Sequence, residues 1–185
     1  ATTFQSSLLD LQKQMDDTEG SATDQAAGLE ALAQKYGENA NGLVSSTADF
    51  KVAGYDMDTS IKLVISSLDL MIAGGVKTSE AVDVINRSLA GFQVPASEVV
   101  TEAQHIGDML NKTADLTKSS FHELAIGYAD FSSTAKLTNL TSEQTAAILS
   151  KVIDVFGSGS EAANSLQSGF LSLLTPTSEA TKEMQ

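Results

Sequence analysis

The sequence contains no cysteine and no tryptophan, and only 2 prolines among 185 residues. Without cysteine there is no disulfide, no thiolate metal site and no cysteine nucleophile, which fits an intracellular origin. Aromatic residues make up 5% of the chain although hydrophobic residues make up 42%. The alternating runs of valine, isoleucine and tyrosine that are typical of strands are missing as well. These shortages favour thin, closely packed helices, and they predict an all-α fold.

Basic residues are also scarce, since 11 Lys and Arg stand against 24 Asp and Glu for a net charge of −13. The excess is even: residues 1–92 carry 13 acidic and 6 basic groups, and residues 93–185 carry 11 and 5. An evenly acidic surface repels phosphate backbones and anionic lipids, so we expect no nucleic-acid binding through charge. No apolar run approaches the length of a membrane span, so membrane contact is not expected for this segment.

Apolar residues recur at helical spacing between glycine-rich turns, which predicts a multi-helix bundle of about nine short helices. The helices are expected where apolar faces cover residues 4–15, 29–36, 43–52, 61–72, 82–89, 99–110, 124–131, 148–156 and 162–173. Three pairs match the capping-box pattern, in which a hydroxyl and a carboxylate or amide satisfy free N–H groups at a helix start: Ser120 with Glu123, Thr141 with Gln144, and Ser158 with Glu161. Residues 39–42 are predicted to form a turn, and Thr175-Pro176 is predicted to stop the last helix.

Two short identities recur at an offset of 81 residues. Ala48-Asp49-Phe50 aligns with Ala129-Asp130-Phe131, and Ser79-Glu80-Ala81 aligns with Ser160-Glu161-Ala162. Apolar residues at helical spacing lie between the identities in both copies. The pattern predicts two duplicated helical units, residues 1–92 and residues 93–185. It leaves open whether they form one bundle or two.

The residues that could carry chemistry do not form a convincing site. His105 and His122 have no second ligand at metal-binding spacing, so they are interpreted as surface or half-buried side chains. Asp56-Met57-Asp58 lacks the glycine and closing glutamate of a calcium loop, and it is interpreted as a turn into a helix. Gly157-Ser158-Gly159-Ser160 lacks the lysine and preceding strand of a phosphate-binding loop, and it is interpreted as a turn between helices.

Three matches to the glycosylation pattern begin at Asn86, Asn111 and Asn139, but each is predicted to lie in a helix or at a helix end. The many serines include no Gly-x-Ser-x-Gly nucleophile motif. We therefore predict no catalytic, cofactor-binding or metal-binding residue, no cofactor, and a protein that is not an enzyme.

An ordered series of helix starts and stops resembles the conserved core region of the tail tape measure proteins of tailed bacteriophages and prophages. The resemblance covers roughly residues 25–182. Its motifs are Gly54-Tyr55-Asp56-Met57, Ala73-Gly74-Gly75, Ser79-Glu80-Ala81-Val82-Asp83-Val84-Ile85, Ala103-Gln104-His105-Ile106-Gly107-Asp108-Met109-Leu110, and Gly157-x-Gly-Ser-Glu-Ala followed by Leu-x-Pro-Thr. The chain departs from the pattern at Ala163, where family members commonly have glycine. We expect the extra methyl group to displace a neighbouring helix slightly, or to mark a divergent branch.

The resemblance implies a structural role. Tape measure proteins occupy the growing tail tube, set its length and scaffold tail assembly, and leave ahead of the DNA at ejection. It implies as partners the tail tube protein, the tail tip or baseplate proteins and the tail assembly chaperones. It implies a location in the virion tail, and in the host cytoplasm during assembly. Self-association stays open. Because the sequence begins without methionine and ends on polar residues, we expect a fragment of a longer protein.

Two other classes of function also stay open. One is a helical protein–protein interaction module, such as an adaptor or a secretion-system substrate, which would carry a concentrated apolar patch. The other is a helical enzyme domain whose partner residues lie outside this sequence. That class would show carboxylates with perturbed pKa values in a cleft.

Overall fold

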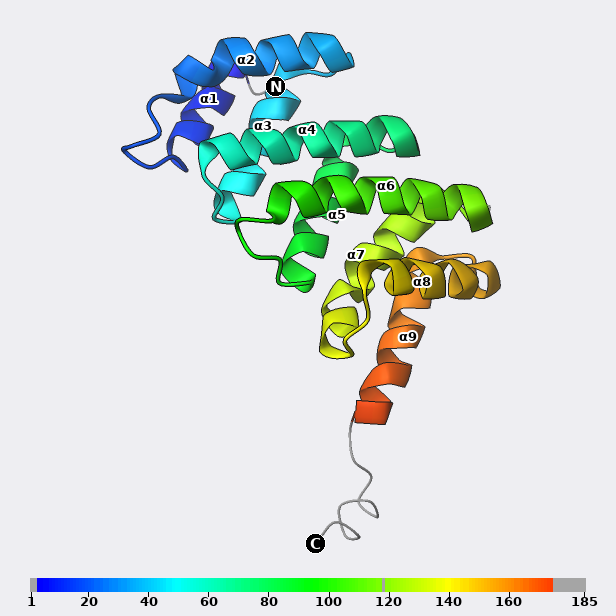
Figure 1. Cartoon of the computed structure of the whole chain (residues 1–185). Coiled ribbons are helices and arrows are strands. Elements are labelled where there is room, and N and C mark those ends of the chain that lie inside the picture. Colours follow the sequence, from blue (N-terminus) through cyan, green and yellow to red (C-terminus); the bar gives the residue numbers. More distant parts are fainter. Residues whose placement is uncertain (1–2, 118, 175–185) are drawn as a thin grey trace, which may run out of the picture. The chain divides into compact units, whose positions relative to one another are not determined.

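The computed structural model describes residues 3–117 and 119–174, and in these ranges it contains nine helices and no strand (Figure 1). The all-α prediction is therefore confirmed. The helices are α1 (Phe4–Gln12), α2 (Ala22–Tyr36), α3 (Ala40–Val52), α4 (Met57–Gly74), α5 (Thr78–Gly91), α6 (Val99–Thr117), α7 (Phe121–Leu137), α8 (Ser142–Phe156) and α9 (Gly159–Leu174). The predicted stop at Thr175-Pro176 lies outside the described residues.

Local capping chemistry sets most helix boundaries. Thr141 and Gln144 form the full capping box predicted for α8, because each side chain accepts a backbone N–H from the other residue. Gly157 ends α8 in the left-handed conformation at φ 73°, which costs glycine no steric penalty. Asn139 takes the same role after α7 at φ 55°, and asparagine is the residue that best tolerates this conformation after glycine.

The predicted turn at residues 39–42 is wrong, because α3 already begins at Ala40. Asn39 lies in extended backbone, and its side chain accepts the Asn41 N–H at 2.8 Å. Asparagine is one of the preferred N-cap residues. Asn39 is therefore the N-cap of α3, although the two asparagines and Gly42 had suggested a loop at residues 39–42.

The helices fall into two compact units. Unit 1 contains residues 1–86 and 95–107, and unit 2 contains residues 87–94 and 108–185. Helices α5 and α6 each contribute residues to both units. The division predicted after residue 92 stays a prediction, and so does the duplication.

Unit 1 is organised around α3, which packs against α1, α2 and α4. Leu43, Val44 and Phe50 of α3 have no solvent-exposed surface. They are spaced so that they share one face of the helix, which is the face that three neighbouring helices cover.

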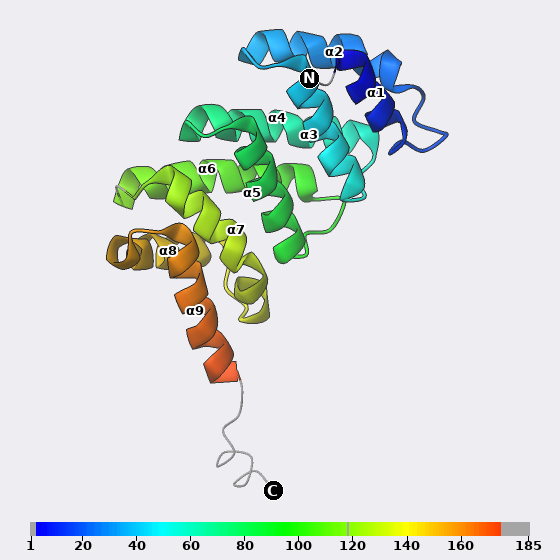
Figure 2. The same ribbon diagram turned by 180° about the vertical axis from the view of Figure 1, so that it is seen from behind.

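Unit 2 is organised around α7, which packs against α8 and α9 (Figure 2). Tyr128 and Phe131 are fully buried, and the ring centroids of Phe131 and Phe170 lie 5.7 Å apart. In both views the last turns of α9 extend beyond α7 and α8.

The first turn of α9 crosses α7 at unusually close range, and two glycines permit it. A Cβ atom on Gly159 would overlap the Glu123 carbonyl oxygen and lie 2.9 Å from the Gly127 nitrogen. A Cβ atom on Gly127 would lie 2.9 Å from the Gly159 carbonyl oxygen. Ala163, at the position where the resemblance favours glycine, is fully buried. The crossing therefore depends on the absence of side chains, as in other close helix contacts.

No single helix among the described residues is both long and apolar enough to cross a membrane. In residues 3–117 and 119–174, only α4 and α5 taken together reach that length and composition, and they meet at a bend of 118°.

The close crossing gives a testable prediction. Gly159→Ala should destabilise the protein by about 2–3 kcal/mol or more, because the added methyl group must push backbone away from backbone. Urea unfolding followed by circular dichroism measures the loss. Gly169→Ala is the matched control in the same helix, since a Cβ atom there meets nothing within 4 Å. That variant should gain up to about 1 kcal/mol from its higher helix propensity. If Gly159→Ala and Gly169→Ala changed the free energy of unfolding equally, the close crossing of α7 and α9 would be contradicted.

Candidate functional site

The two histidines lie apart from any metal-binding arrangement. His105 is an exposed residue of α6 in unit 1, and His122 is an exposed residue in the first turn of α7 in unit 2. Among residues 3–117 and 119–174, no group of three or more His, Asp or Glu side chains could hold a metal ion. Their placement agrees with the interpretation as surface residues.

Only Gly157 and Ser158 of the glycine-rich stretch lie between α8 and α9, because α9 already begins at Gly159. The interpretation of residues 157–160 as a turn between helices is therefore right for the first two residues and wrong for Gly159 and Ser160. The first N–H of α9, on Gly159, donates to the Glu123 carboxylate at 2.6 Å. A helix N-terminus attracts anions through its free N–H groups. Here a carboxylate from α7 already occupies the place that a phosphate would take.

This contact also changes the capping predicted at Ser120. The Ser120 side chain accepts the Glu123 N–H at 3.4 Å, as a capping box requires. The Glu123 carboxylate does not return to the Ser120 backbone but reaches α9. The sequence pattern therefore found the cap and missed the bond between helices.

The Asp56-Met57-Asp58 stretch starts a helix, as interpreted from the sequence. Asp56 is the N-cap of α4 and accepts the Thr59 N–H at 2.8 Å, a bond that lowers the pKa of its carboxyl. Asp58 pairs with Lys62 one turn later at 2.5 Å. Both carboxylates have local partners and neither is arranged as part of a calcium loop.

The three asparagines of the glycosylation pattern lie where the sequence predicted. Asn86 is in α5, Asn111 is in α6, and Asn139 directly follows the C-terminal turn of α7.

A buried ion pair in unit 1 was missed by the sequence analysis. Glu19 lies in the segment between α1 and α2. Its two carboxylate oxygens accept hydrogen bonds from the Lys51 Nζ at 2.7 and 2.8 Å. The Glu19 carboxylate also accepts the backbone N–H groups of Met57 at 2.6 Å and Asp16 at 2.8 Å. Only 11% of the Glu19 side chain and 4% of the Lys51 side chain are exposed. One carboxylate therefore ties a loop to the end of α3 and the start of α4.

The signal that could have revealed this pair is the position of Lys51. It lies on the same face of α3 as Leu43, Val44 and Phe50, so helical spacing places a charge among core residues. A buried lysine requires a partner.

The ion pair and the hydrogen bonds around it lower the pKa of the Glu19 carboxyl. Burial raises its pKa, but the hydrogen bonds from Lys51, Asp16 and Met57 and the Lys51 charge outweigh burial. The net pKa lies below the ordinary value of 4.5.

The two aspartates of the repeated Ala-Asp-Phe motif lie in different settings. In unit 2, Asp130 accepts hydrogen bonds from the Arg87 guanidinium and, at 2.7 Å, from the Ser160 hydroxyl. In unit 1, Asp49 and Ser79 line an open groove of about 380 Å³ between α3 and α5. The structure thus brings the residues of the two repeated motifs together in each unit.

The groove in unit 1 is the arrangement nearest to an acidic catalytic cleft. It is lined by two carboxylates, on Asp49 and Asp83, and burial raises the pKa of Asp49. Its other lining residues are valine, serine and asparagine. Asp49 matches in sequence a residue with a structural role, since Asp130 ties α7 to α9.

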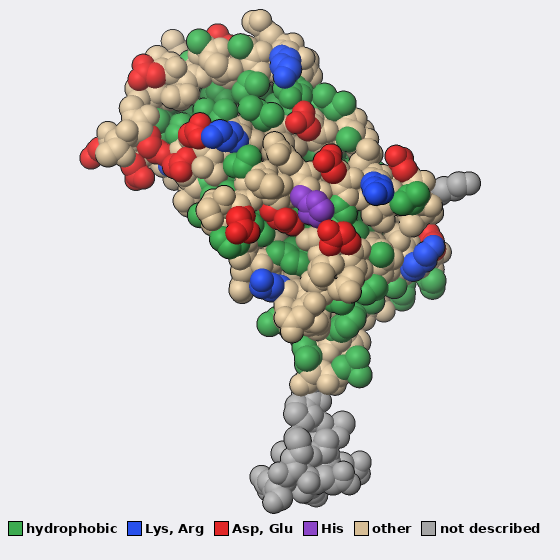
Figure 3. Space-filling model, viewed as in Figure 1, with side chains coloured by type: hydrophobic (Ala, Val, Ile, Leu, Met, Phe, Trp, Pro, Cys, Tyr) green, Lys and Arg blue, Asp and Glu red, His purple; other side chains and the backbone are tan. Residues whose placement is uncertain are grey.

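The visible face of the molecule has acidic side chains scattered over it and few basic ones (Figure 3). Hydrophobic side chains are exposed toward the end of α9, where Leu173 is 84% and Leu174 53% accessible. This apolar end contrasts with the charged surface elsewhere on that face.

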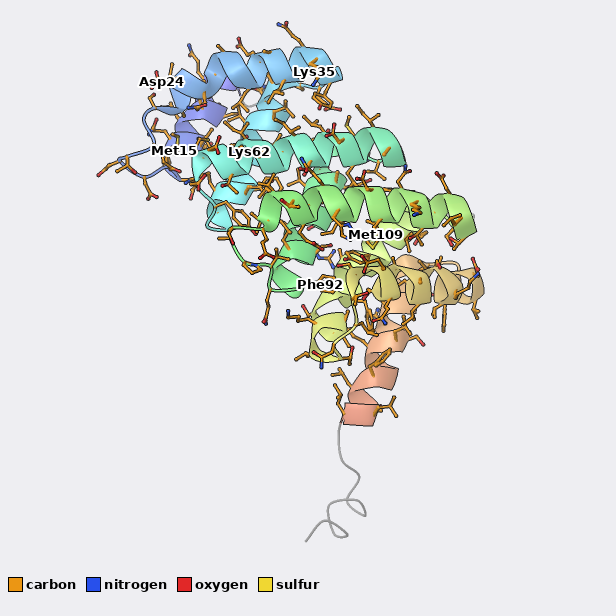
Figure 4. All side chains as sticks on the ribbon, viewed as in Figure 1. Met15, Asp24, Lys35, Lys62, Phe92 and Met109 are labelled. Carbon is orange, nitrogen blue, oxygen red and sulfur yellow. The ribbon has the colours of Figure 1, made fainter. Side chains whose placement is uncertain are left out.

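The buried ion pair gives a prediction. Glu19→Gln should lower the free energy of unfolding at pH 7 by about 3 kcal/mol, because Lys51 is left buried without a counter-charge. Thermal or urea unfolding measures this loss. The control is Asp58→Asn, which removes the partner of Lys62 on the exposed side of α4 (Figure 4). An exposed pair contributes little, so stability should stay nearly unchanged.

The same pair predicts a pH dependence. The folded-state pKa of Glu19 is lowered, so its contribution is fully present above the ordinary value of 4.5 and is lost as pH falls through the folded-state value. The stability of Glu19→Gln should therefore converge with that of the unchanged protein in acid. A constant difference down to about pH 3 would contradict the assignment.

A family model described as "phage-related minor tail protein" matches residues 30–185. Neither the curated proteins nor the solved structures that were searched contain a significant match. The family match covers most of the chain, with all of unit 2 and the part of unit 1 that follows residue 29. The chain belongs to the phage-related minor tail protein family, and so to the structural components of phage tails.

Proposed function

We propose that this chain is the folded helical core segment of a tail tape measure protein, which sets the length of the tail tube and scaffolds tail assembly. The observation that carries the proposal is the series of helix starts and stops resembling that core region, within a chain of the minor tail protein family. Catalysis plays no part in this role.

The dimensions of the helices support a compact segment rather than an extended ruler. The longest helix in the described part of the chain, α6, has 19 residues and is about 28 Å long. A single helix of 185 residues would extend roughly 280 Å. In this proposal the length is set by other, extended parts of the protein, while this segment supplies a folded anchor.

The acidic charge supports a protein that shares the tail tube with DNA without binding it. A net charge of −13 repels phosphates, and the first N–H of α9 is already bonded to a carboxylate. Partners in this role are the tail tube protein, the tail tip or baseplate proteins and the tail assembly chaperones. The segment acts in the virion tail, after assembly in the host cytoplasm.

A second candidate function is a helical interaction module outside the tape measure role. The exposed apolar end of α9 favours it, because such a surface on an acidic protein is typical of a contact site.

Tail length distinguishes the two candidates. In a phage or prophage that encodes this chain, one in-frame deletion removes residues 40–174, and a matched deletion removes equally many residues from the long-helix part of the same gene product. The matched deletion should shorten the tail by about 200 Å, at 1.5 Å per residue. Deletion of residues 40–174 should instead give lost or aberrant tails in electron micrographs. Normal tails of unchanged length from both deletions would overturn the tape measure proposal and favour the interaction module.

A further inference from the structure

Three helices of the chain share one apolar pattern at the offset of 81 residues. In each helix, apolar side chains recur with spacings of four and then three residues, so they occupy one face. The sets are Phe4, Leu8 and Leu11 in α1; Ile85, Leu89 and Phe92 in α5 and directly after it; and Leu166, Phe170 and Leu173 in α9.

The first set is covered within unit 1. Leu8 and Leu11 are 8% and 0% exposed, and α1 packs against α3, the central helix of that unit. Helix α1 is thus the first helix of unit 1.

The end of the second set is covered within unit 2, where residues 87–94 pack against α7, the central helix of that unit. The ring centroids of Phe92 and Tyr128 lie 5.4 Å apart, and a Cβ atom on Gly91 would lie 2.6 Å from the Ser132 Cβ. Arg87 also pairs with Asp130 of α7. The end of α5 therefore packs on the central helix of unit 2, as α1 packs on the central helix of unit 1.

The third set ends differently. Phe170 packs on Phe131, but Leu173, at the position that corresponds to Phe92, is 84% exposed. Residues 162–174 carry no charge in a chain with net charge −13, so this end of α9 lacks the usual character of a solvent-facing helix. The position that corresponds to Gly91 is Ser172, which is also small.

The sequence after α9 continues the correspondence. Residues 175–185 match residues 94–104 at the same offset, and residues 94–104 lead from the end of α5 into α6. The shared residues are Pro95 and Pro176, Ser97 and Ser178, Glu98 and Glu179, Glu102 and Glu183, and Gln104 and Gln185. The sequence after α9 thus resembles the sequence that follows α5 and leads into α6.

We infer that residues 168–174 of α9 form the first helix of a third helical unit and dock a further helix pair of the α6–α7 type carried by the same polypeptide. The docked helix presents an apolar residue to Leu173 where Tyr128 meets Phe92, and a small residue to Ser172 where Ser132 meets Gly91. It needs no carboxylate equivalent to Asp130, because Ser168 stands at the position of Arg87. This inference does not depend on the tape measure role.

The test builds the third unit from the chain's own sequence. In the test protein, residues 1–174 are followed directly by a second copy of residues 94–174. Leu174 then precedes Val94 of the second copy, and this keeps the offset of 81 because Leu174 corresponds to Gln93. Because the protein has no cysteine, Leu173→Cys in the first copy gives a single reactive thiol. Thiol labelling should slow by about tenfold or more relative to the same substitution in the 185-residue chain, since docking limits access to opening events. Val155→Cys on α8, 80% exposed in the 185-residue chain, is the control and should react at the same rate in both proteins.

Circular dichroism and molecular mass complete the test. The helical signal should rise in proportion to the added residues, and both proteins should stay monomeric. The inference is overturned if the added copy is unfolded. It is also overturned if the added copy folds but the cysteine at position 173 is still labelled as fast as in the 185-residue chain. If labelling at position 173 is already slow in a 185-residue dimer, the surface binds a second copy instead and the inference is wrong.

Discussion

The close crossing of α7 and α9 in unit 2 is the constraint on which the other contacts of that unit depend. Gly127 and Gly159 allow backbone to meet backbone, and the Glu123 carboxylate binds the first N–H of α9. At that distance Ser160 reaches Asp130, and Phe170 reaches Phe131. Small residues at the crossing, rather than large aromatic ones, thus explain how a chain with 5% aromatic content builds a packed core.

In unit 1 a different interaction has the same organising role. The Glu19 carboxylate joins the loop before α2 to Lys51 of α3 and to the first N–H of α4. Both units are therefore built on one central helix whose neighbours are fixed by a few polar contacts. Such contacts specify which helices meet, because a buried charge left unpaired is costly.

Local chemistry made much of the fold predictable. Hydroxyl and amide caps such as Thr141 and Gln144, and stops such as Gly157, act within one turn of the chain, so their spacing in the sequence determines their partners. Asn39 shows the limit, because an asparagine before a helix and one in a turn have the same sequence signature. The bonds from Glu19 to Lys51 and from Glu123 to Gly159 join residues 32 and 36 positions apart, and no local spacing encodes them. The sequence analysis placed an apolar face over residues 162–173, but periodicity does not tell whether a partner covers that face, and Leu173 is exposed.

Hydrogen exchange of the 185-residue protein tests most directly the account in which the glycine crossing holds unit 2 together. Amides of α7 near Gly127 and of the first turns of α9 should exchange only through unfolding of the whole unit, and should therefore be among the slowest. The last turn of α9, around Leu173, should exchange many times faster. Fast exchange at the crossing together with slow exchange elsewhere in unit 2 would contradict the account.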